Sequence, residues 1–177
     1  MNKIYIILSQ SNTILARIVQ LYTRKKYSHA ALALDDSLDK IYSFGRWYPR
    51  LMLPAGFITE HRGKGYFDLF PQTAICVLEV SVSDAQLSDI KEKLMPFVQQ
   101  PNKYLYDVAS LPAMMFGKSF KRKNRYVCSS FVAYILDNCL DFKTEYSLVY
   151  PQDFFHLGLK KVYEGEVQYY GKKQLSC

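Results

Sequence analysis

Residues 74–82 read Ala-Ile-Cys-Val-Leu-Glu-Val-Ser-Val, and the polar residue Ser83 follows them directly. An apolar run this rich in β-branched residues predicts a buried strand. Beyond it, four apolar residues recur at helical spacing, so we predict a helix from about Ser83 to near Pro101. A buried strand followed by such a helix indicates a fold built from both α and β elements. The four apolar positions are Leu87, Ile90, Leu94 and Phe97.

The chain before this stretch predicts further strands. Lys3 to Leu8 forms a short apolar run typical of a buried strand, and apolar residues at helical spacing over 14–22 predict a helix. Tyr27 to Leu34 predicts a strand, with Lys40 to Phe44 as its hairpin partner. The prolines and glycines of 47–72 show no period, so we expect a long loop there that covers or shapes a site.

The chain after Pro101 predicts further helices and one more strand. A weakly helical stretch follows Tyr104 to Asp107, and a basic loop spans Lys118 to Arg125. Residues 127–140 give the clearest helix, with Phe131, Ile135 and Leu136 facing inward. From Pro151 onward we expect a short helix and a last strand over Val162 to Tyr169. Since there are no internal repeats or linkers, residues 1–177 are expected to form a single α+β domain.

Composition limits the classes of partner. The chain has 177 residues, of which 49% are hydrophobic, and no apolar run reaches the ~18 residues that a membrane span needs. No signal peptide is recognisable, so a cytoplasmic location is expected. The net charge of +7 permits nucleic acid, an anionic lipid surface or an acidic substrate as partner.

The four cysteines lack CxxC or zinc-ribbon spacing, and without an export signal we expect them to be reduced. Cys128 falls at the start of the clearest helix, with Lys123 and Arg125 close before it. The helix dipole and these cations both lower a thiol pKa, so Cys128 is a candidate nucleophile. The same position also suits a small buried side chain. Cys76 lies in the apolar strand and is expected in the core. Cys139 lies about three turns after Cys128 on the same predicted helix, and Cys177 is the last residue of the chain.

Only three histidines are available to act with a thiol. His29 is followed by Ala30 and Ala31, whose small side chains would let another element approach its strand closely. A strand histidine bonded to backbone is the competing interpretation. His156 is the rival base, although it lies among aromatic residues that suit a packed histidine better, and His61 is expected to be solvated.

A group of short motifs carries a resemblance. Tyr27 to Leu34 reads Tyr-Ser-His-Ala-Ala-Leu-Ala-Leu, residues 41–44 read Ile-Tyr-Ser-Phe, and Tyr-Asp at 106–107 precedes Tyr-Val-Cys-Ser-Ser-Phe-Val at 126–132. These motifs resemble the circularly permuted branch of the NlpC/P60 papain-like hydrolases, the group that also resembles lecithin retinol acyltransferases. The order of His29 before Cys128 is the one that the permuted branch requires. The resemblance implies a permuted papain-like fold, with a central antiparallel sheet packed against the helix that carries the cysteine.

The resemblance also implies roles for single residues. Cys128 matches the family's nucleophile and His29 its general base, while the third, orienting position falls on Ser43, where a hydroxyl stands in place of a stronger polar group. Tyr106 matches a tyrosine beside the nucleophile that can support an oxyanion, although a packed tyrosine fits equally well. Glu60 is a further candidate for orienting His29 or for contacting substrate, against the simpler interpretation of an exposed carboxylate.

The expected function is that of a thiol hydrolase or acyltransferase that cleaves an amide or ester through a Cys128 thioester, and no metal or cofactor is expected. The family implies cell-wall-type peptides or lipid acyl groups as substrate. The alternative is an inactive scaffold that binds an anionic ligand, a lipid surface or nucleic acid through its basic loop. Because the chain has 15 Tyr and 11 Phe, aromatic residues near the cations are unavoidable and are poor evidence for nucleic-acid binding, so no specific nucleic acid is expected as partner. The candidate anion-binding residues are Lys121, Arg122, Lys123 and Arg125.

Overall fold

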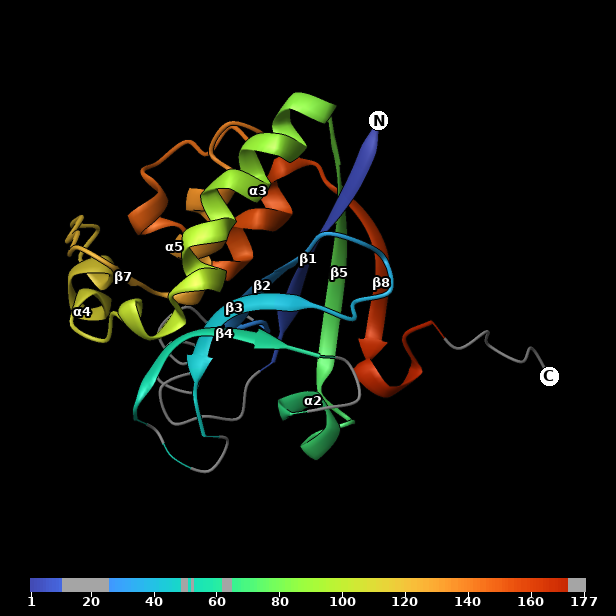
Figure 1. The fold of residues 1–177 in the computed structure, drawn as a ribbon, viewed down its shortest axis with the longest axis horizontal. Coiled ribbons are helices and arrows are strands. Elements are labelled where there is room, and N and C mark those ends of the chain that lie inside the picture. Colours follow the sequence, from blue (N-terminus) through green and yellow to red (C-terminus); the bar gives the residue numbers. More distant parts are fainter. Residues whose placement is uncertain (11–25, 49–50, 52, 62–64, 172–177) are drawn as a thin grey trace.

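A computed structural model of the chain describes residues 1–10, 26–48, 51, 53–61 and 65–171 (Figure 1). The helix predicted over 14–22 and the terminal Cys177 lie outside these residues. One sheet runs through the described part of the molecule. Its strands are β1 (Asn2–Ser9), β2 (His29–Ala33), β3 (Ile41–Arg46), β4 (Ala55–Glu60), β5 (Ala74–Val82), β6 (Leu105–Tyr106), β7 (Arg125–Tyr126) and β8 (Lys160–Glu166).

The eight strands lie in the order β7-β6-β4-β3-β2-β1-β5-β8. All neighbouring pairs are antiparallel except β6 and β7, which run parallel. The parallel pair needs a crossover, and the chain between the two strands supplies it with residues 107–124. The predicted class, α+β with a largely antiparallel central sheet, is therefore confirmed.

The helices gather mainly on one face of the sheet, where α3 and α5 lie side by side (Figure 1). Ser83 starts α3 with a capping box: its hydroxyl accepts a hydrogen bond from the Gln86 N–H at 3.2 Å, and the Gln86 side chain accepts one from the Ser83 N–H at 2.9 Å. The helices are α2 (Tyr66–Leu69), α3 (Asp84–Gln99), α4 (Ser110–Met115) and α5 (Cys128–Ile135), with 3-10 turns η1 (Pro101–Lys103), η2 (Tyr146–Leu148), η3 (Pro151–Leu157) and η4 (Val167–Tyr169).

Each face of the sheet has its own core, which explains why β1 is a continuous apolar run. Ile4, Ile6 and Leu8 pack with α3 and α5, whereas Tyr5 and Ile7 pack on the opposite face. The core on the helix side is rich in aromatic rings and includes Cys128 near the start of α5. The central rings of this core are Phe44, Phe57, Phe97 and Phe131.

Two sequence predictions are wrong. The expected loop over 47–72 contains β4, which pairs with β3 from Ala55 to Glu60, and the short helix α2. Pro54 and Gly56 obscured this strand in the sequence, although Phe57 is buried in the core. The helix predicted over 127–140 ends at Ile135, so Cys139 lies beyond it and not on the same helical face as Cys128.

Other elements follow the prediction in whole or in part. β5 spans Ala74–Val82 as predicted, and the tail holds a 3-10 helix and a last strand, β8. The predicted strand over Val162 to Tyr169 ends at Glu166, because Val167–Tyr169 form η4, and the short strands β6 and β7 were not predicted. Within the described ranges, no helix combines the length and the apolar composition needed to cross a bilayer.

Candidate active site

The site begins with an incomplete ladder between β2 and β3. The two strands pair at Leu32 with Tyr42 and at Ala33 with Ile41, and the ladder carries no paired position nearer to His29. A buried backbone group that loses its strand partner needs another one. The backbone of Ala30, which is fully buried, is therefore left to interact with side chains.

Ser43 fills this gap from β3. Its hydroxyl donates to the Ala30 carbonyl oxygen at 2.8 Å and lies 3.0 Å from Nε2 of His29. A hydroxyl has one proton, and that proton goes to the carbonyl. Nε2 of His29 must therefore be the donor in the second contact, which leaves Nδ1 of the neutral ring unprotonated. Ser43 thus fixes the tautomer in which His29 can accept a proton at Nδ1.

Cys128 is the first residue of α5, and only 4% of it is exposed. Burial by itself raises the pKa of the Cys128 thiol, but the charge of His29 and a hydrogen bond from its ring lower the pKa by more. The backbone N–H of Ala30 adds a further hydrogen bond that lowers it. Since Nε2 of His29 is held by Ser43, Nδ1 is the ring nitrogen that remains for the thiol.

His29 responds in the opposite direction. Burial lowers its pKa, but the negative charge on Cys128 and the hydrogen bond between the two side chains raise it, so that the net pKa is above the usual value. A thiol with a lowered pKa beside an imidazole with a raised pKa favours a thiolate–imidazolium pair. The two sequence candidates are therefore brought together as a chemically coupled pair.

Tyr106 approaches the same sulfur from β6. Its hydroxyl lies 4.0 Å from Sγ of Cys128, within reach of a weak hydrogen bond to sulfur. Burial, followed by the charge of Cys128, raises the pKa of Tyr106 well above its usual value. The phenol therefore keeps its proton and is a hydrogen-bond donor towards the sulfur.

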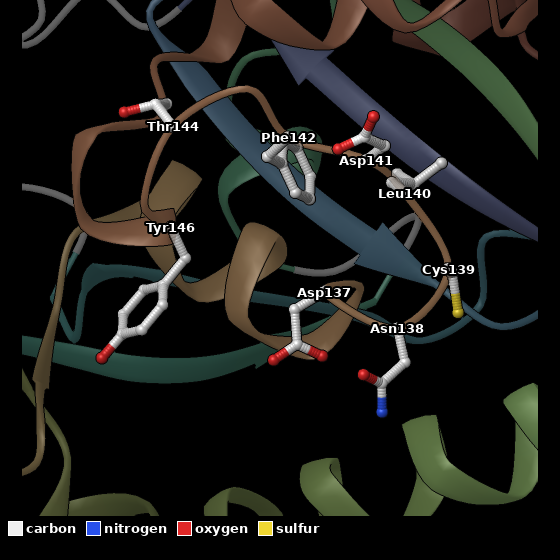
Figure 2. A pocket seen from close by; sticks show the side chains of 8 residues that line it. All are labelled: Asp137, Asn138, Cys139, Leu140, Asp141, Phe142, Thr144 and Tyr146. Carbon is white, nitrogen blue, oxygen red and sulfur yellow. The ribbon is translucent and has the colours of Figure 1, made fainter.

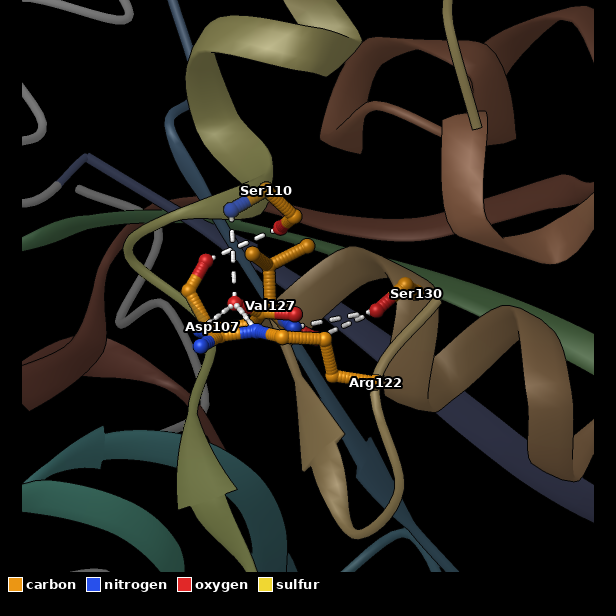
Figure 3. A network of polar contacts seen from close by, with 5 residues as sticks. All are labelled: Asp107, Ser110, Arg122, Val127 and Ser130. Carbon is orange, nitrogen blue, oxygen red and sulfur yellow. Dashed lines mark hydrogen bonds and ion pairs between the residues drawn. The ribbon is translucent and has the colours of Figure 1, made fainter. Parts of the chain in front are cut away.

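An ion pair between Asp107 and Arg122 holds the residue that follows Tyr106 (Figure 3). The buried carboxylate of Asp107 accepts from Nε of Arg122 at 3.1 Å and also forms a close ion pair with Nη2 of the same guanidinium. The Asp107 carboxylate also accepts from the N–H of Ser110 at 3.3 Å, at the start of α4. Asp107 thereby ties together the ends of the crossover that links β6 to β7.

The start of α5 offers further donors. Its N-cap residue is Val127, whose N–H donates to the Ser130 hydroxyl at 3.0 Å (Figure 3). Among the described residues, no side chain caps the amides of the first turn. Such amides, including that of Cys128, carry the partial positive charge of a helix N-terminus. They are suited to hold a negative oxygen next to the thiol.

Glu60 lies at the end of β4, where it is half-buried. Burial raises the pKa of its carboxyl group, while the positive charges of His29 and Arg46 lower it by less. Its charge in turn raises the pKa of His29. Glu60 therefore influences the pair electrostatically, whereas Ser43 makes the direct hydrogen bond to the ring.

The other cysteines and histidines lie in different surroundings. Cys76 is buried in β5, where burial raises the pKa of its thiol to about 11, which confirms it as core. Cys139 is half-buried, and burial raises its pKa as well. His61 is exposed as predicted, but His156 is also exposed and the prediction of a packed ring is wrong. Across the described ranges, no three His, Cys, Asp or Glu side chains gather as a metal site.

The basic run divides into engaged and exposed side chains. Arg122 is held by Asp107 and is half-buried, so its charge is largely used inside the fold. Lys121 forms a surface ion pair with Glu145 at 3.2 Å and lies 4.9 Å from the ring of Tyr146. Lys123 is exposed and Arg125 is half-buried. Of the four anion-binding candidates, Arg122 thus has a structural partner that the sequence did not indicate.

A hollow of about 480 Å³ lies at the other end of α5 (Figure 2). It is lined by Asp137, Asn138 and Cys139, with Phe142 and Tyr146 across from them. None of the candidate catalytic side chains faces it. The chemistry and this hollow are therefore separate features, at opposite ends of one helix.

Comparison with known proteins adds no relative. No family model, no curated protein and no solved structure matches this chain significantly. The interpretation of the site rests on its own geometry. That geometry includes two features that the sequence did not reveal: the open ladder at Ala30 and the Asp107–Arg122 ion pair. The only sequence signal of the ion pair was an aspartate, Asp107, that precedes a run of cations.

Proposed function

We propose that this protein is a cysteine-dependent hydrolase or acyltransferase that cleaves an amide or ester through a thioester on Cys128. The observation that carries the proposal is the hydrogen-bond chain from the Ala30 carbonyl through Ser43 to Nε2 of His29, because it leaves Nδ1 as a base for the thiol. The lowered pKa of Cys128 and the raised pKa of His29 support the same roles.

The reaction would proceed in two halves. The Cys128 thiolate attacks the substrate carbonyl carbon, and the amides at the start of α5 and the Tyr106 hydroxyl are placed to hold the resulting oxyanion. The C–N or C–O bond then breaks, and the His29 imidazolium gives its proton to the leaving amine or alcohol. His29 next takes a proton from water, or from an acceptor alcohol or amine, which attacks the thioester and regenerates the thiolate.

Ser43 would act as a positioning residue in this scheme. It holds the imidazole in one tautomer, but as a neutral hydroxyl it stabilises the imidazolium less than a carboxylate would. The negative charge of Glu60, when ionised, adds stabilisation from a greater distance. We therefore expect a slower enzyme than one in which a carboxylate bonds the histidine directly.

The order of the site residues supports a proposal for the fold family. His29 and Ser43 lie on adjacent strands, and the helix that carries Cys128 follows them in the chain. This order agrees with the circularly permuted NlpC/P60 papain-like hydrolases that the motifs resemble. On that proposal, the substrate is a small peptide amide or a lipid acyl group, and the protein needs no cofactor.

The test is to trap the acyl-enzyme. The protein is incubated with p-nitrophenyl acetate at pH 7, and the acylated residue is located by mass spectrometry after an acid quench. We expect one acetyl group on Cys128, none on that peptide in Cys128→Ser, and unchanged labelling in the control Cys139→Ser. Equal acetylation of Cys128 and Cys139, or none on Cys128, would contradict the proposal.

A further inference from the structure

The crossover between β6 and β7 is basic and carries no acidic residue after Asp107. Residues 108–125 contain no Asp or Glu but five cations. Because β6 and β7 pair in parallel, with Leu105 beside Arg125 and Tyr106 beside Tyr126, the two ends of the crossover lie side by side. One end follows Tyr106 and the other leads into Cys128. The crossover therefore borders the candidate active site.

Large apolar side chains are exposed on the same crossover. Phe116 is 80% exposed, Phe120 is 47% exposed and Val108 is 41% exposed. Single exposed apolar residues are ordinary, but three on one short segment mark a contact surface. Phe116 is the C-cap residue of α4, and Gly117 after it ends the helix with a positive φ of 66° and an N–H that donates to the Met114 carbonyl at 2.9 Å.

Exposed lysines surround these rings. Lys118 and Lys123 are exposed and have no ion pair among the described residues, and Lys121 is paired only at the surface with Glu145. A surface pair of this kind contributes little and is readily exchanged for another anion. Arg122, by contrast, is paired with the buried carboxylate of Asp107 and lies 5.8 Å from the Phe120 ring. These two contacts hold the segment on the fold.

We infer that residues 108–123 form a docking surface for an anionic lipid bilayer. Exposed lysines attract the anionic headgroups, while phenylalanine and aliphatic side chains enter the boundary of the acyl chains. Val108 favours a bilayer over nucleic acid, because an aliphatic side chain has no π-face on which a base can stack. Docking there would bring acyl esters of the bilayer to the Cys128 end of α5. This last step rests on the proposed thiol chemistry, whereas the docking itself does not.

The experiment measures sedimentation of the full chain with vesicles of phosphatidylcholine, with and without 30% phosphatidylglycerol. We expect binding to the anionic vesicles only. Lys118→Gln/Lys121→Gln/Lys123→Gln should weaken it by on the order of 100-fold, since each lysine near the surface contributes about fivefold. Phe116→Ser/Phe120→Ser should weaken it at least tenfold without changing the net charge.

A matched control separates this surface from the net charge. Lys40→Gln/Lys91→Gln/Lys160→Gln removes three exposed lysines elsewhere, one of them on β8 at the opposite edge of the sheet from β7, and should leave binding within about threefold, because distant surface charges are screened. Equal binding to neutral vesicles, or an equal loss in the control, would overturn the inference. So would binding to a single-stranded oligonucleotide as tight as to vesicles and insensitive to the Phe116/Phe120 variant.

The active-site proposal is tested separately. Vesicle binding involves no turnover and should be the same in Cys128→Ser, whereas acetylation by the soluble ester involves no vesicles. If the protein binds anionic vesicles but Cys128 is not acetylated, the thiol chemistry alone is contradicted. If Cys128 is acetylated but the protein does not bind the vesicles, the docking surface alone is contradicted.

Discussion

The two ends of α5 place two cysteines in opposite chemical states. Cys128, at the start, is the more deeply buried, yet the pKa of its thiol is lowered. Cys139, four residues beyond the last residue of α5, is half-buried, and the pKa of its thiol is raised. Burial raises the pKa of both, so burial cannot explain the difference.

The difference lies in the partners of each sulfur. Cys128 faces the imidazole of His29, the N–H of Ala30 and the hydroxyl of Tyr106, all of which favour the thiolate. Near Cys139 the charge of Asp89 works against the thiolate, and Lys93 offsets this only in part. Cys76, buried in β5, shows how a core thiol behaves, with a pKa of about 11. The comparison teaches that the direction in which a thiol pKa shifts in this protein depends on the groups around the sulfur and not on its exposure.

Replacing His29 should have the largest effect on this comparison. In His29→Gln, which retains a similar size, burial of Cys128 remains while the main stabilising charge is lost, so its pKa should rise above the usual value of 9.0. A thiol with a pKa of about 9 is less than ~1% ionised at pH 6.5, so alkylation of Cys128 by iodoacetamide should fall by about 100-fold. His156→Gln, on an exposed histidine, is the matched control and should leave the rate unchanged.

Breaking the Asp107–Arg122 ion pair should lower stability at the Cys128 end of the helix. Removal of one partner of a fully buried pair costs about 3–5 kcal/mol, and since the Arg122 side chain is 34% exposed, we expect about 2 kcal/mol for Arg122→Gln. Lys143→Gln, which removes an exposed pair with Asp141, should change stability by less than ~0.5 kcal/mol. Urea unfolding measures both. Equal stability of the two variants would show that the buried pair contributes no more than the exposed one.

Ser43→Ala should have an intermediate effect. The variant removes the acceptor for Nε2–H and leaves the Ala30 carbonyl without its donor, so His29 is no longer held in one tautomer. We expect about a tenfold slower alkylation of Cys128 at pH 6.5, equivalent to ~1.4 kcal/mol, with Cys139 unaffected. An unchanged rate for Cys128 would show that His29 does not depend on Ser43 for its orientation.

Tyr106→Phe should have the smallest effect, because the hydroxyl lies 4.0 Å from the sulfur and contributes the last of the influences on its pKa. A weak hydrogen bond to sulfur predicts about a threefold decrease in alkylation at pH 6.5. If Tyr106 supports the oxyanion, the decrease in acetylation by the ester should be larger than the decrease in alkylation. Equal decreases would limit Tyr106 to tuning the thiolate.

Elements with one clear period could be predicted from the sequence, whereas elements defined by long-range pairing could not. β5 and α3 follow from their apolar pattern and from Ser83, because local sequence and burial agree there. β4 was missed because Pro54 and Gly56 mark a loop locally, and only its pairing with β3 makes it a strand. Local propensity is overridden wherever tertiary contacts decide the structure.

The same distinction holds for the site. Cys128, His29 and Ser43 could be named from short motifs, and the structure brings these side chains together. The chain of hydrogen bonds through the Ala30 carbonyl could not be predicted, because it depends on where the β2–β3 ladder stops. Arg122 was interpreted as free for an anionic ligand because its partner, Asp107, lies 15 residues earlier and reaches it only through the parallel β6–β7 pair.

The central claim, that Cys128 alone is activated, is tested most directly by the pH dependence of alkylation at each cysteine. Iodoacetamide labelling of the folded protein between pH 5 and 10, with peptides quantified by mass spectrometry, gives one curve for Cys128 and one for Cys139. Because the pKa of Cys128 is lowered and that of Cys139 is raised, Cys128 should remain reactive at pH 6, where Cys139 loses about tenfold per pH unit. Two curves that coincide, each with its midpoint above pH 8.5, would contradict the claim.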